Sequence, residues 1–206
     1  MAEPTLRERK RQRTRQAIVD AAVELFEERG YEGTTVADIA EAAEIGTRTF
    51  FSYFASKEEV LFPESDSRVA AAVEAIATRG PEERPADVLL RALRTVNRDS
   101  DEMVSRVAAL RLRFFRSEPA VRGRGLQLQF DAQREIARHL FAAYADELDE
   151  AGAAALVGAF IGAVTGALQV LLETAGDDPA TMSRRLQEAT DAALRPWLRE
   201  QGRPYI

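Results

Sequence analysis

The sequence TTVADIAEAA at residues 34–43, followed by TFFSYFASKEEVL at residues 49–61, decides the fold of this chain. Thr35 and Asp38 have the spacing of a capping box, which predicts a short helix within the first stretch. A second short helix is expected over residues 47–54. Two short helices joined by a tight turn form a helix-turn-helix. The second helix of such a unit fits the DNA major groove, which is about 12 Å wide.

Helical spacing continues on both sides of these two stretches. Apolar residues upstream recur with the period of a helix that Thr14 is expected to cap and Gly30 to end. Downstream, Ser56 and Glu59 also have capping-box spacing. They predict a longer helix that continues to Ile76 and bends near Pro63.

The rest of the chain also shows helical periodicity, and the alternation typical of strands is nearly absent. Further helices are expected over residues 85–98, 101–116, 126–147, 150–175 and 179–200. Gly123 and Gly125 are expected to break the chain between two of them, and Pro196 to end or kink the last one. The sequence therefore predicts an all-α protein of about nine helices.

Composition excludes several classes of function. The chain of 206 residues has no cysteine and one histidine, His139, so a thiolate site and a multi-histidine metal site are unavailable within it. We therefore expect a protein that is not an enzyme, with no catalytic residue, metal or cofactor. Residues 1–15 are rich in arginine and lack the apolar region of a secretory signal, so a cytoplasmic protein is expected.

One long apolar stretch, residues 151–172, has the length of a membrane span. Many of its residues are glycine or alanine, and acidic rather than basic residues flank it, which disfavours a span. Gly158, Gly162 and Gly166 share one helix face, where small residues allow two helices to approach closely. The stretch is interpreted as a packing helix that forms, with the 179–200 helix, a four-helix interface in a dimer.

The two stretches quoted first resemble the N-terminal domain of the TetR family of bacterial transcriptional regulators, over about residues 12–62. Residues 80–206 match the family only in their helical pattern. The resemblance implies a homodimeric, repressor-type protein that binds double-stranded DNA and responds to a small effector. It implies a DNA-binding domain at 14–62 and an effector-binding and dimerisation domain at 63–206, and the charge of the N-terminus indicates a basic arm at residues 1–13.

The same resemblance implies six DNA-binding residues, which are Thr35, Thr47, Arg48, Thr49, Tyr53 and Lys57. Thr35 sits where the family caps its second helix and contacts phosphate, and Lys57 sits at the usual cationic phosphate contact. Thr49 and Tyr53 occupy positions that contact the DNA backbone. Arg48 is the candidate for reading guanine, because its guanidinium fork matches guanine O6 and N7. The alternative for Arg48 is an exposed surface charge.

Three residues depart from the family's pattern. Phe51 stands where a tyrosine is common, Ala37 replaces a frequent basic residue, and Glu44 replaces the usual glycine of the turn. Phe50 and Phe54, four residues apart, are expected in the core of the domain rather than at DNA.

The candidate effector site begins with Arg111, which interrupts an apolar face of the expected 101–116 helix. A buried arginine needs an anionic partner, so Arg111 is a candidate anchor for an anionic effector. A structural ion pair or a snorkelling side chain is the alternative. Phe114, Phe130 and Phe160 are candidates to line the effector pocket, unless they only fill the core.

Six arginines lie among residues 106–124 against one acidic residue, Glu118. This region resembles TetR-family regulators that respond to acyl-coenzyme A thioesters, which implies a hydrophobic, anionic, acyl-CoA-like effector. A neutral hydrophobic effector is the alternative.

Two other classes of function remain open. One is a helical protein or enzyme that binds acyl thioesters without specific DNA binding, although no convergent nucleophile or acid/base pair emerges from the sequence. The other is an interaction module with no small ligand, which predicts a fully packed second domain.

Charge is unevenly distributed along the chain. Residues 1–16 hold six basic and two acidic groups, a net charge of +4, whereas residues 17–62 hold three basic and ten acidic groups, a net charge of -7. DNA should repel such an acidic module at long range. The N-terminal arm is therefore expected to supply much of the attraction, by following phosphates or entering a minor groove. A solvated tail is the alternative.

Overall fold

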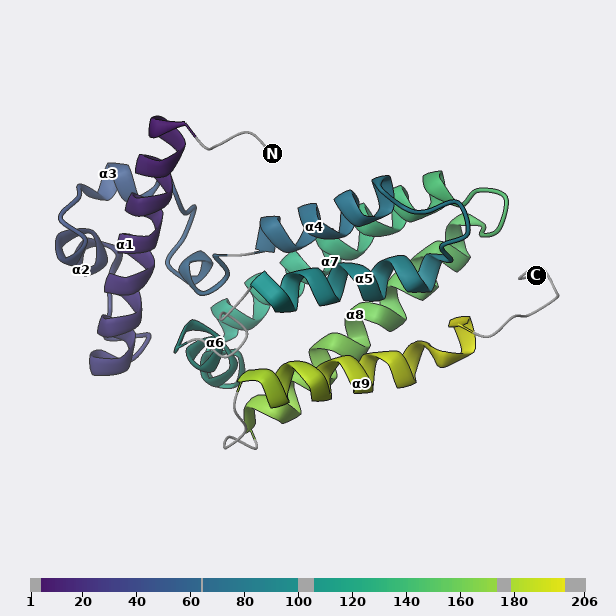
Figure 1. The fold of residues 1–206 in the computed structure, drawn as a ribbon. Coiled ribbons are helices and arrows are strands. Elements are labelled where there is room, and N and C mark those ends of the chain that lie inside the picture. Colours follow the sequence, from purple (N-terminus) through teal and green to yellow (C-terminus); the bar gives the residue numbers. More distant parts are fainter. Residues whose placement is uncertain (1–4, 64, 100–105, 174–178, 199–206) are drawn as a thin grey trace. The chain divides into compact units, whose positions relative to one another are not determined.

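The fold is described from a computed structural model, which describes residues 5–63, 65–99, 106–173 and 179–198. Every regular element among these residues is helical, as the sequence predicts (Figure 1). The described elements are α1 (Leu6–Arg29), α2 (Val36–Ala42), α3 (Thr47–Phe50), the 3-10 helix η1 (Glu58–Leu61), α4 (Ser65–Ala77), α5 (Pro85–Asp99), α6 (Arg106–Ser117), α7 (Pro119–Ala143), α8 (Glu150–Glu173) and α9 (Pro179–Leu198).

The described residues group into two compact units. The first unit takes its residues from Met1–Pro63 and Arg106–Gly125, and the second from Glu64–Ser105 and Leu126–Ile206. The sequence assigns residues 106–125 to the effector domain, whereas the structure groups them with the helix-turn-helix. The reason is packing: Phe114 of α6 is buried against Phe26 and Tyr31, at ring-centroid distances of 5.7 Å from each.

Helix α1 begins nine residues earlier than expected. Thr14 does not cap it, because its hydroxyl donates to the carbonyl of Lys10 one turn back (3.1 Å). The N-cap is Thr5, which forms a complete capping box with Glu8. Arginine, lysine, glutamine and glutamate are strong helix formers, so the basic stretch after this cap continues as helix rather than as an arm.

Two expected features of the chain differ in the structure. The helix expected from Ser56 to Ile76 is divided into η1 and α4, and Glu59 accepts a hydrogen bond from the backbone N–H of Ala55 (2.6 Å) instead of completing a box with Ser56. The break expected at Gly123 and Gly125 is wrong, because α7 continues through both to Ala143. Glycine lowers helix stability by only about 1 kcal/mol, which tertiary packing can offset.

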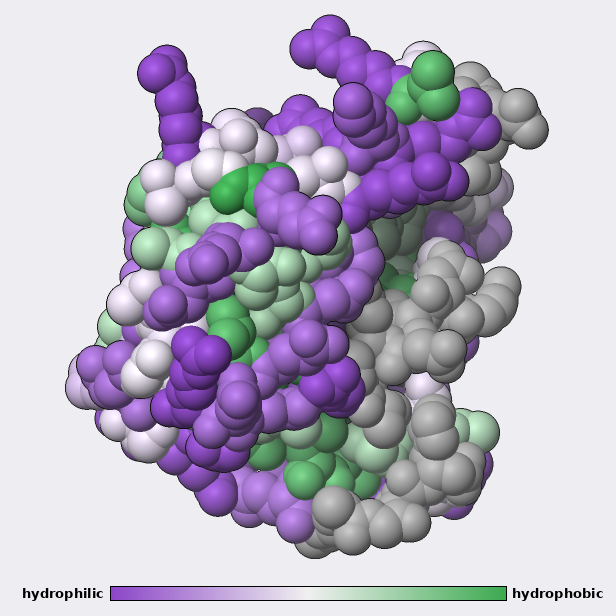
Figure 2. Space-filling view, turned by 90° about the vertical axis from the view of Figure 1, so that its left-hand side faces the viewer, coloured by the Kyte–Doolittle hydropathy of each residue, from purple (hydrophilic) through white to green (hydrophobic). Residues whose placement is uncertain are grey.

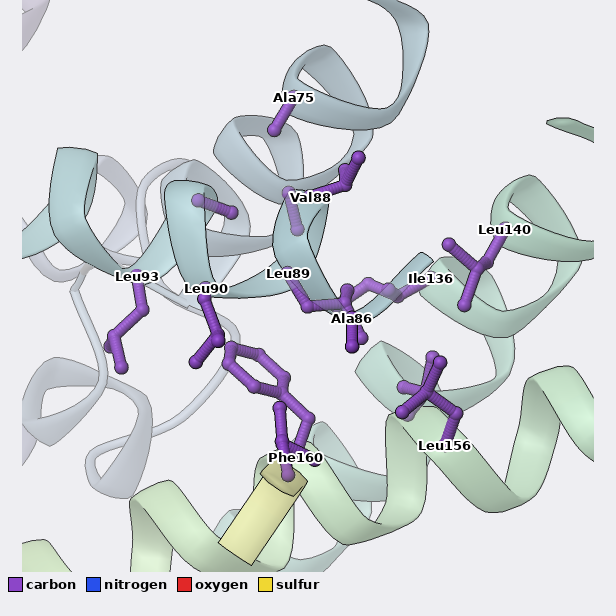
Figure 3. Packing of buried hydrophobic residues seen from close by; sticks show 14 of the residues in the cluster. Ala75, Ala86, Val88, Leu89, Leu90, Leu93, Ile136, Leu140, Leu156 and Phe160 are labelled. Carbon is purple, nitrogen blue, oxygen red and sulfur yellow. The ribbon is translucent and has the colours of Figure 1, made fainter. Parts of the chain in front are cut away.

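The second unit consists of α4, α5, α8, α9 and the later part of α7, around one core of buried aliphatic residues. Phe160 of α8 reaches toward Leu89 and Leu90 of α5 (Figure 3). Helix α8 packs along α9 and also contacts α5. The described part of α9 runs through Pro196 to Leu198, so the proline does not end it before Leu198.

Helix α8 is long and apolar enough to cross a bilayer, the only such helix among the residues described. Five of its side chains are nevertheless buried in the core of the second unit: Ala153, Leu156, Val157, Phe160 and Leu171. Length and apolarity alone are weak evidence for a membrane span. The five buried residues pack α8 against its own unit, and the interface with a second copy stays a prediction.

Candidate nucleic-acid interface

The turn of the helix-turn-helix depends on one residue in a left-handed conformation. Glu44 has φ of 54°, and it is the one non-glycine residue with positive φ among those described. The chain reverses there, with the Ile45 N–H donating to the Ala40 carbonyl (2.9 Å). Gly46 then caps α3. Glu44, which stands where the usual glycine of the turn is expected, therefore has a backbone conformation that favours glycine.

Helix α3 divides its residues between the core and the surface. Phe50 is fully buried and Phe54 nearly so, which confirms their expected place in the core. Thr47, Arg48 and Thr49 are all exposed, at the start of this helix. The side of the molecule that α1, α2 and α3 occupy is mostly hydrophilic in the space-filling view (Figure 2). The three residues predicted to contact DNA from the start of α3 are thus held at the surface by a buried phenylalanine in the next turn.

Phe51 is an exposed aromatic residue beside them. Its ring is 55% exposed and lies edge-on to Phe50, with 5.5 Å between the ring centroids. Where the family commonly carries a hydroxyl, this chain presents an apolar ring to solvent.

Thr35 caps α2 in the capping box expected from the sequence. The Asp38 N–H donates to the Thr35 hydroxyl (3.2 Å), while the Thr35 hydroxyl and N–H donate to the Asp38 carboxylate (2.6 and 2.8 Å). These bonds, first that from the hydroxyl and then that from the N–H, hold the pKa of Asp38 below its ordinary value. A phosphate at this helix start would compete with the Asp38 carboxylate for the Thr35 hydroxyl.

Lys57 is half-buried and bonds to the backbone of the same unit. Its ammonium donates to the carbonyls of Tyr31 (2.7 Å) and Thr34 (2.9 Å). An ammonium carries three N–H donors, so two of them have partners inside the protein. The sequence predicts a phosphate contact at this lysine and does not anticipate its internal bonds.

Arg15 ties α1 to both ends of the segment that follows α3. Its guanidinium donates to the carbonyls of Tyr53 (3.1 Å) and Pro63 (2.9 Å) and lies 4.2 Å from the centre of the Phe54 ring. One turn earlier on α1, the guanidinium of Arg11 lies 6.0 Å from the centre of the Tyr53 ring. The sequence analysis counts Arg15 among the charges of the N-terminal arm, residues 1–16, because no local signal indicates a partner 38 or 48 residues away.

A second anchor of this segment comes from α7 and was not predicted. Glu59 forms an ion pair with Arg124 through one carboxylate oxygen, and its other oxygen accepts the bond from the Ala55 N–H. Arg111 of α6 donates to the Leu61 carbonyl (3.3 Å) and faces the ring of Phe62. The first residues after the helix-turn-helix are thus fixed to α6 and α7 as well as to α1.

The arginines of α6 and α7 change the electrostatic balance of the DNA-binding unit. Residues 17–62 alone carry a net charge of -7. Over residues 5–63 and 106–125, however, 15 basic residues face 12 acidic ones, a net charge of +3. Some of this charge is neutralised locally: Arg106, for example, pairs with Glu27 and lowers the pKa of that carboxyl.

The four candidate effector residues are divided between the two units. Arg111 and Phe114 belong to the first unit, where Phe114 is buried in the core of the helix-turn-helix domain. Phe130 and Phe160 belong to the second unit, where Phe130 is 59% exposed on α7 and Phe160 is buried in the core. The contacts of Arg111 agree with a structural role, and an effector contact at these four residues stays a prediction.

Sequence comparisons agree with the geometry of the first unit. Residues 18–62 match the model of the bacterial regulatory proteins of the tetR family. The chain is 45% identical over 93 residues to the HTH-type transcriptional regulator TcmR of Streptomyces glaucescens, covering 45% of this chain and 41% of that protein. It is 42% identical over 48 residues to the HTH-type transcriptional regulator HbdR of Aromatoleum sp., covering 23% and 21%. These matches span less than half of either relative.

Solved structures extend the likeness to most of the chain. FadR of Thermus thermophilus, a TetR-family transcriptional repressor solved in complex with lauroyl-CoA, matches with a TM-score of 0.58 and 24% identity, over 93% of this chain and 99% of that chain. The fatty acid degradation regulator FadR of Bacillus halodurans matches with a TM-score of 0.53 and 18% identity, over 88% and 96%. At these identities the likeness shows a shared fold.

Proposed function

We propose that this chain is a TetR-family transcriptional regulator with a DNA-binding domain, and that it acts as a dimeric repressor of a near-palindromic operator. The match of residues 18–62 to the family model, the relatives named as transcriptional regulators and the shared fold support this proposal. The observation that carries this proposal is the start of α3, where Thr47, Arg48 and Thr49 are exposed above the buried Phe50. Two such helices in a symmetric dimer would read half-sites centred about 34–36 Å apart, one turn of DNA.

Within each half-site, we assign base reading to Arg48, which is exposed and whose fork fits guanine O6 and N7. Thr49 and Tyr53 would contact the DNA backbone, and Thr35 would do so at the start of α2. Lys57 would offer a phosphate the one N–H that its two internal bonds leave.

The proposed dimer forms through α8 and α9. Ala155, Ala159, Gly162 and Gly166 leave a stripe of small, exposed residues on α8, and a Cβ built at Gly162 or Gly166 meets no atom within 4 Å in the single chain. Helix α9 exposes small residues as well, among them Ala189 and Ala193. Two copies that pack these faces together would bury an apolar surface that would otherwise face water.

Replacing Gly162 by leucine tests this dimer. Because the site is open in the single chain, the variant should fold normally and obstruct only the approach of a second copy. Gly123→Leu is the matched control, since Gly123 is a helical glycine in the first unit with equally open surroundings. Sedimentation at micromolar concentration should show a weaker dimer for Gly162→Leu and an unchanged dimer for Gly123→Leu. If Gly162→Leu dimerises as strongly as wild type, the glycine face of α8 does not form the dimer interface.

We propose that the effector is a small hydrophobic molecule, with an acyl-CoA thioester as the first candidate. The fold shared with the FadR structure that contains lauroyl-CoA supports this class. Arg111 bonds to the Leu61 carbonyl, so an anionic group that contacted Arg111 would bind a side chain that is already attached to the DNA-binding unit. A coupling of about 1–3 kcal/mol would change the DNA affinity by roughly 5–150-fold.

Selection of duplexes from a random pool tests the regulator itself. The purified wild-type dimer should enrich a near-palindrome, and Arg48→Met should lose discrimination of about 1–3 kcal/mol at one base pair of each half-site. Arg184→Met, which removes an exposed α9 charge, is the control and should bind as wild type does. Lauroyl-CoA should raise the melting temperature and shift operator affinity. Turnover of lauroyl-CoA without enrichment of any duplex would instead favour an enzyme.

A further inference from the structure

The basic residues before the helix-turn-helix lie on helix α1, so the helix fixes the face on which each of them lies. Residues 6–17 of α1 precede its first buried residue, Ile18, and residues 6–13 are all exposed. Five cations lie in this exposed part: Arg7, Arg9, Lys10, Arg11 and Arg13. A helix advances about 100° per residue, so these five charges cannot all point the same way.

Arg15 identifies the face of α1 that turns toward the segment that follows α3. Its guanidinium is fixed on the Tyr53 and Pro63 carbonyls and on the Phe54 ring. Arg11, four residues earlier, continues this face and lies over the ring of Tyr53. Arg7, four residues earlier again, is rotated by about 40° from Arg11 and about 80° from Arg15, so it lies nearer this face than the other exposed cations do.

The remaining cations lie on the other side of α1. At about 100° per residue, Arg9 and Arg13 are rotated by roughly 120° and 160° from Arg15, and Lys10 by a similar amount in the other direction. Glu8 lies on the Arg15 side, about 20° from Arg15, and its carboxylate accepts hydrogen bonds from the N–H and hydroxyl of Thr5 at the helix start.

We propose that Arg7 and Arg11 form, with Tyr53, one continuous phosphate-binding surface that contacts the duplex backbone flanking each operator half-site. This rests on the proposed function, in which Tyr53 contacts the DNA backbone. Arg7 and Arg11 are exposed and positive, and Tyr53 is half-buried in the segment that follows α3, so the surface is complementary to the polyanionic backbone. Arg7 and Arg11 lie outside the segment that matches the family model, residues 18–62.

The helix limits how many phosphates this surface neutralises. Arg7 and Arg11 are about one turn apart, about 5.4 Å along the axis, and they are the two exposed cations on the Arg15 side. Each phosphate contact contributes about -0.9 to the slope of log affinity against log salt. The surface therefore accounts for up to about 1.8 of that slope per subunit, whereas a flexible arm would engage its charges without regard to helix face.

Two matched double variants of the full-length dimer test the proposal. Arg7→Gln with Arg11→Gln and Arg9→Gln with Arg13→Gln remove the same residue types and the same charge from the same exposed helix. Affinity for the selected operator duplex is measured across a salt series, with circular dichroism to check that α1 stays helical. The first pair should flatten the slope by up to about 1.8 per subunit, and the second pair by much less.

Equal slopes for the two pairs, or a larger effect of the Arg9 and Arg13 pair, would overturn the proposal. Replacing Arg7 and Arg11 by lysine should restore the slope, because the charge and its position on the helix return. If wild type enriches no duplex at all, the proposed function fails and this surface fails with it. If the dimer binds the operator but the two double variants give equal slopes, only the proposed surface is overturned and the proposed function stands.

Discussion

Lys57 and Tyr31 are joined twice, because the Lys57 ammonium donates to the Tyr31 carbonyl at 2.7 Å and also lies 3.8 Å from the centre of the Tyr31 ring. The contact ties the segment after α3 to the connection between α1 and α2. A lysine that sequence reasoning assigned only to DNA therefore also stabilises the domain that presents it.

Replacing Lys57 by methionine should lower the free energy of unfolding by roughly 1–3 kcal/mol, because the carbonyls of Tyr31 and Thr34 lose a charged donor. Urea unfolding measures this loss. Lys10→Met is the control, since Lys10 is exposed on α1 and should leave stability unchanged. A Lys57→Met protein as stable as wild type would show that the internal bonds contribute nothing net.

Glycine at position 44 should stabilise the protein. Glu44 holds φ of 54°, a conformation that costs a residue with a Cβ roughly 1 kcal/mol and costs glycine nothing sterically. Glu44→Gly should therefore raise the unfolding midpoint in urea. Glu41→Gly, at an exposed position in the last turn of α2, should lower the midpoint, with a loss of roughly 0.5–1 kcal/mol in the free energy of unfolding. Changes of the same sign in both variants would contradict this reading of the turn.

Stability at acid pH should depend on Asp38. Its folded-state pKa is depressed by the bonds from Thr35, so its contribution is fully present above the unfolded value of about 3.9 and is lost as pH falls through the folded value. Asp38→Asn keeps an oxygen that can accept the Thr35 N–H and cannot titrate in this range. The difference in urea midpoint between the two proteins should shrink below about pH 4. A difference that stayed constant from pH 6 to pH 3 would exclude this role.

Two glycines of α7 should respond oppositely to alanine. A Cβ at Gly123 meets nothing within 4 Å, so Gly123→Ala should stabilise the helix by about 1 kcal/mol. At Gly125 a Cβ would lie 2.9 Å from the Phe115 ring and 3.1 Å from the Phe62 ring, so these side chains would have to move. Gly125→Ala should therefore be less stable than Gly123→Ala, as thermal unfolding would measure. Equal gains would mean that both rings move aside freely.

Local pattern in the sequence was sufficient for the fold class and for much of the candidate interface. Apolar periodicity predicts the helices, the Thr35–Asp38 spacing predicts the cap of α2, and the spacing of Phe50 and Phe54 predicts their burial. Each of these signals arises from residues within one or two helical turns of each other. They therefore do not depend on how distant segments meet.

Contacts between distant segments were not predictable in this way. Arg124 pairs with Glu59 across 65 residues, and Arg15 bonds to Pro63 across 48, with no local signal at either end. The basic cluster at residues 106–124 looked like an anion site of the effector domain. The cluster lies in the first unit because Phe114 packs against Phe26. The hydrophobicity of Phe114 alone does not show which of the two cores it joins.

The capping box of Thr5 and Glu8 affects the entropy of association with DNA. A disordered basic tail must lose backbone freedom when it binds, at roughly 1–2 kcal/mol for each residue that becomes fixed. In this chain the box closes the first turn of α1, and the packed part of the same helix supports the other end. The basic segment therefore loses its backbone entropy when the free protein folds and not when it binds DNA. More of the electrostatic free energy of binding then contributes to affinity.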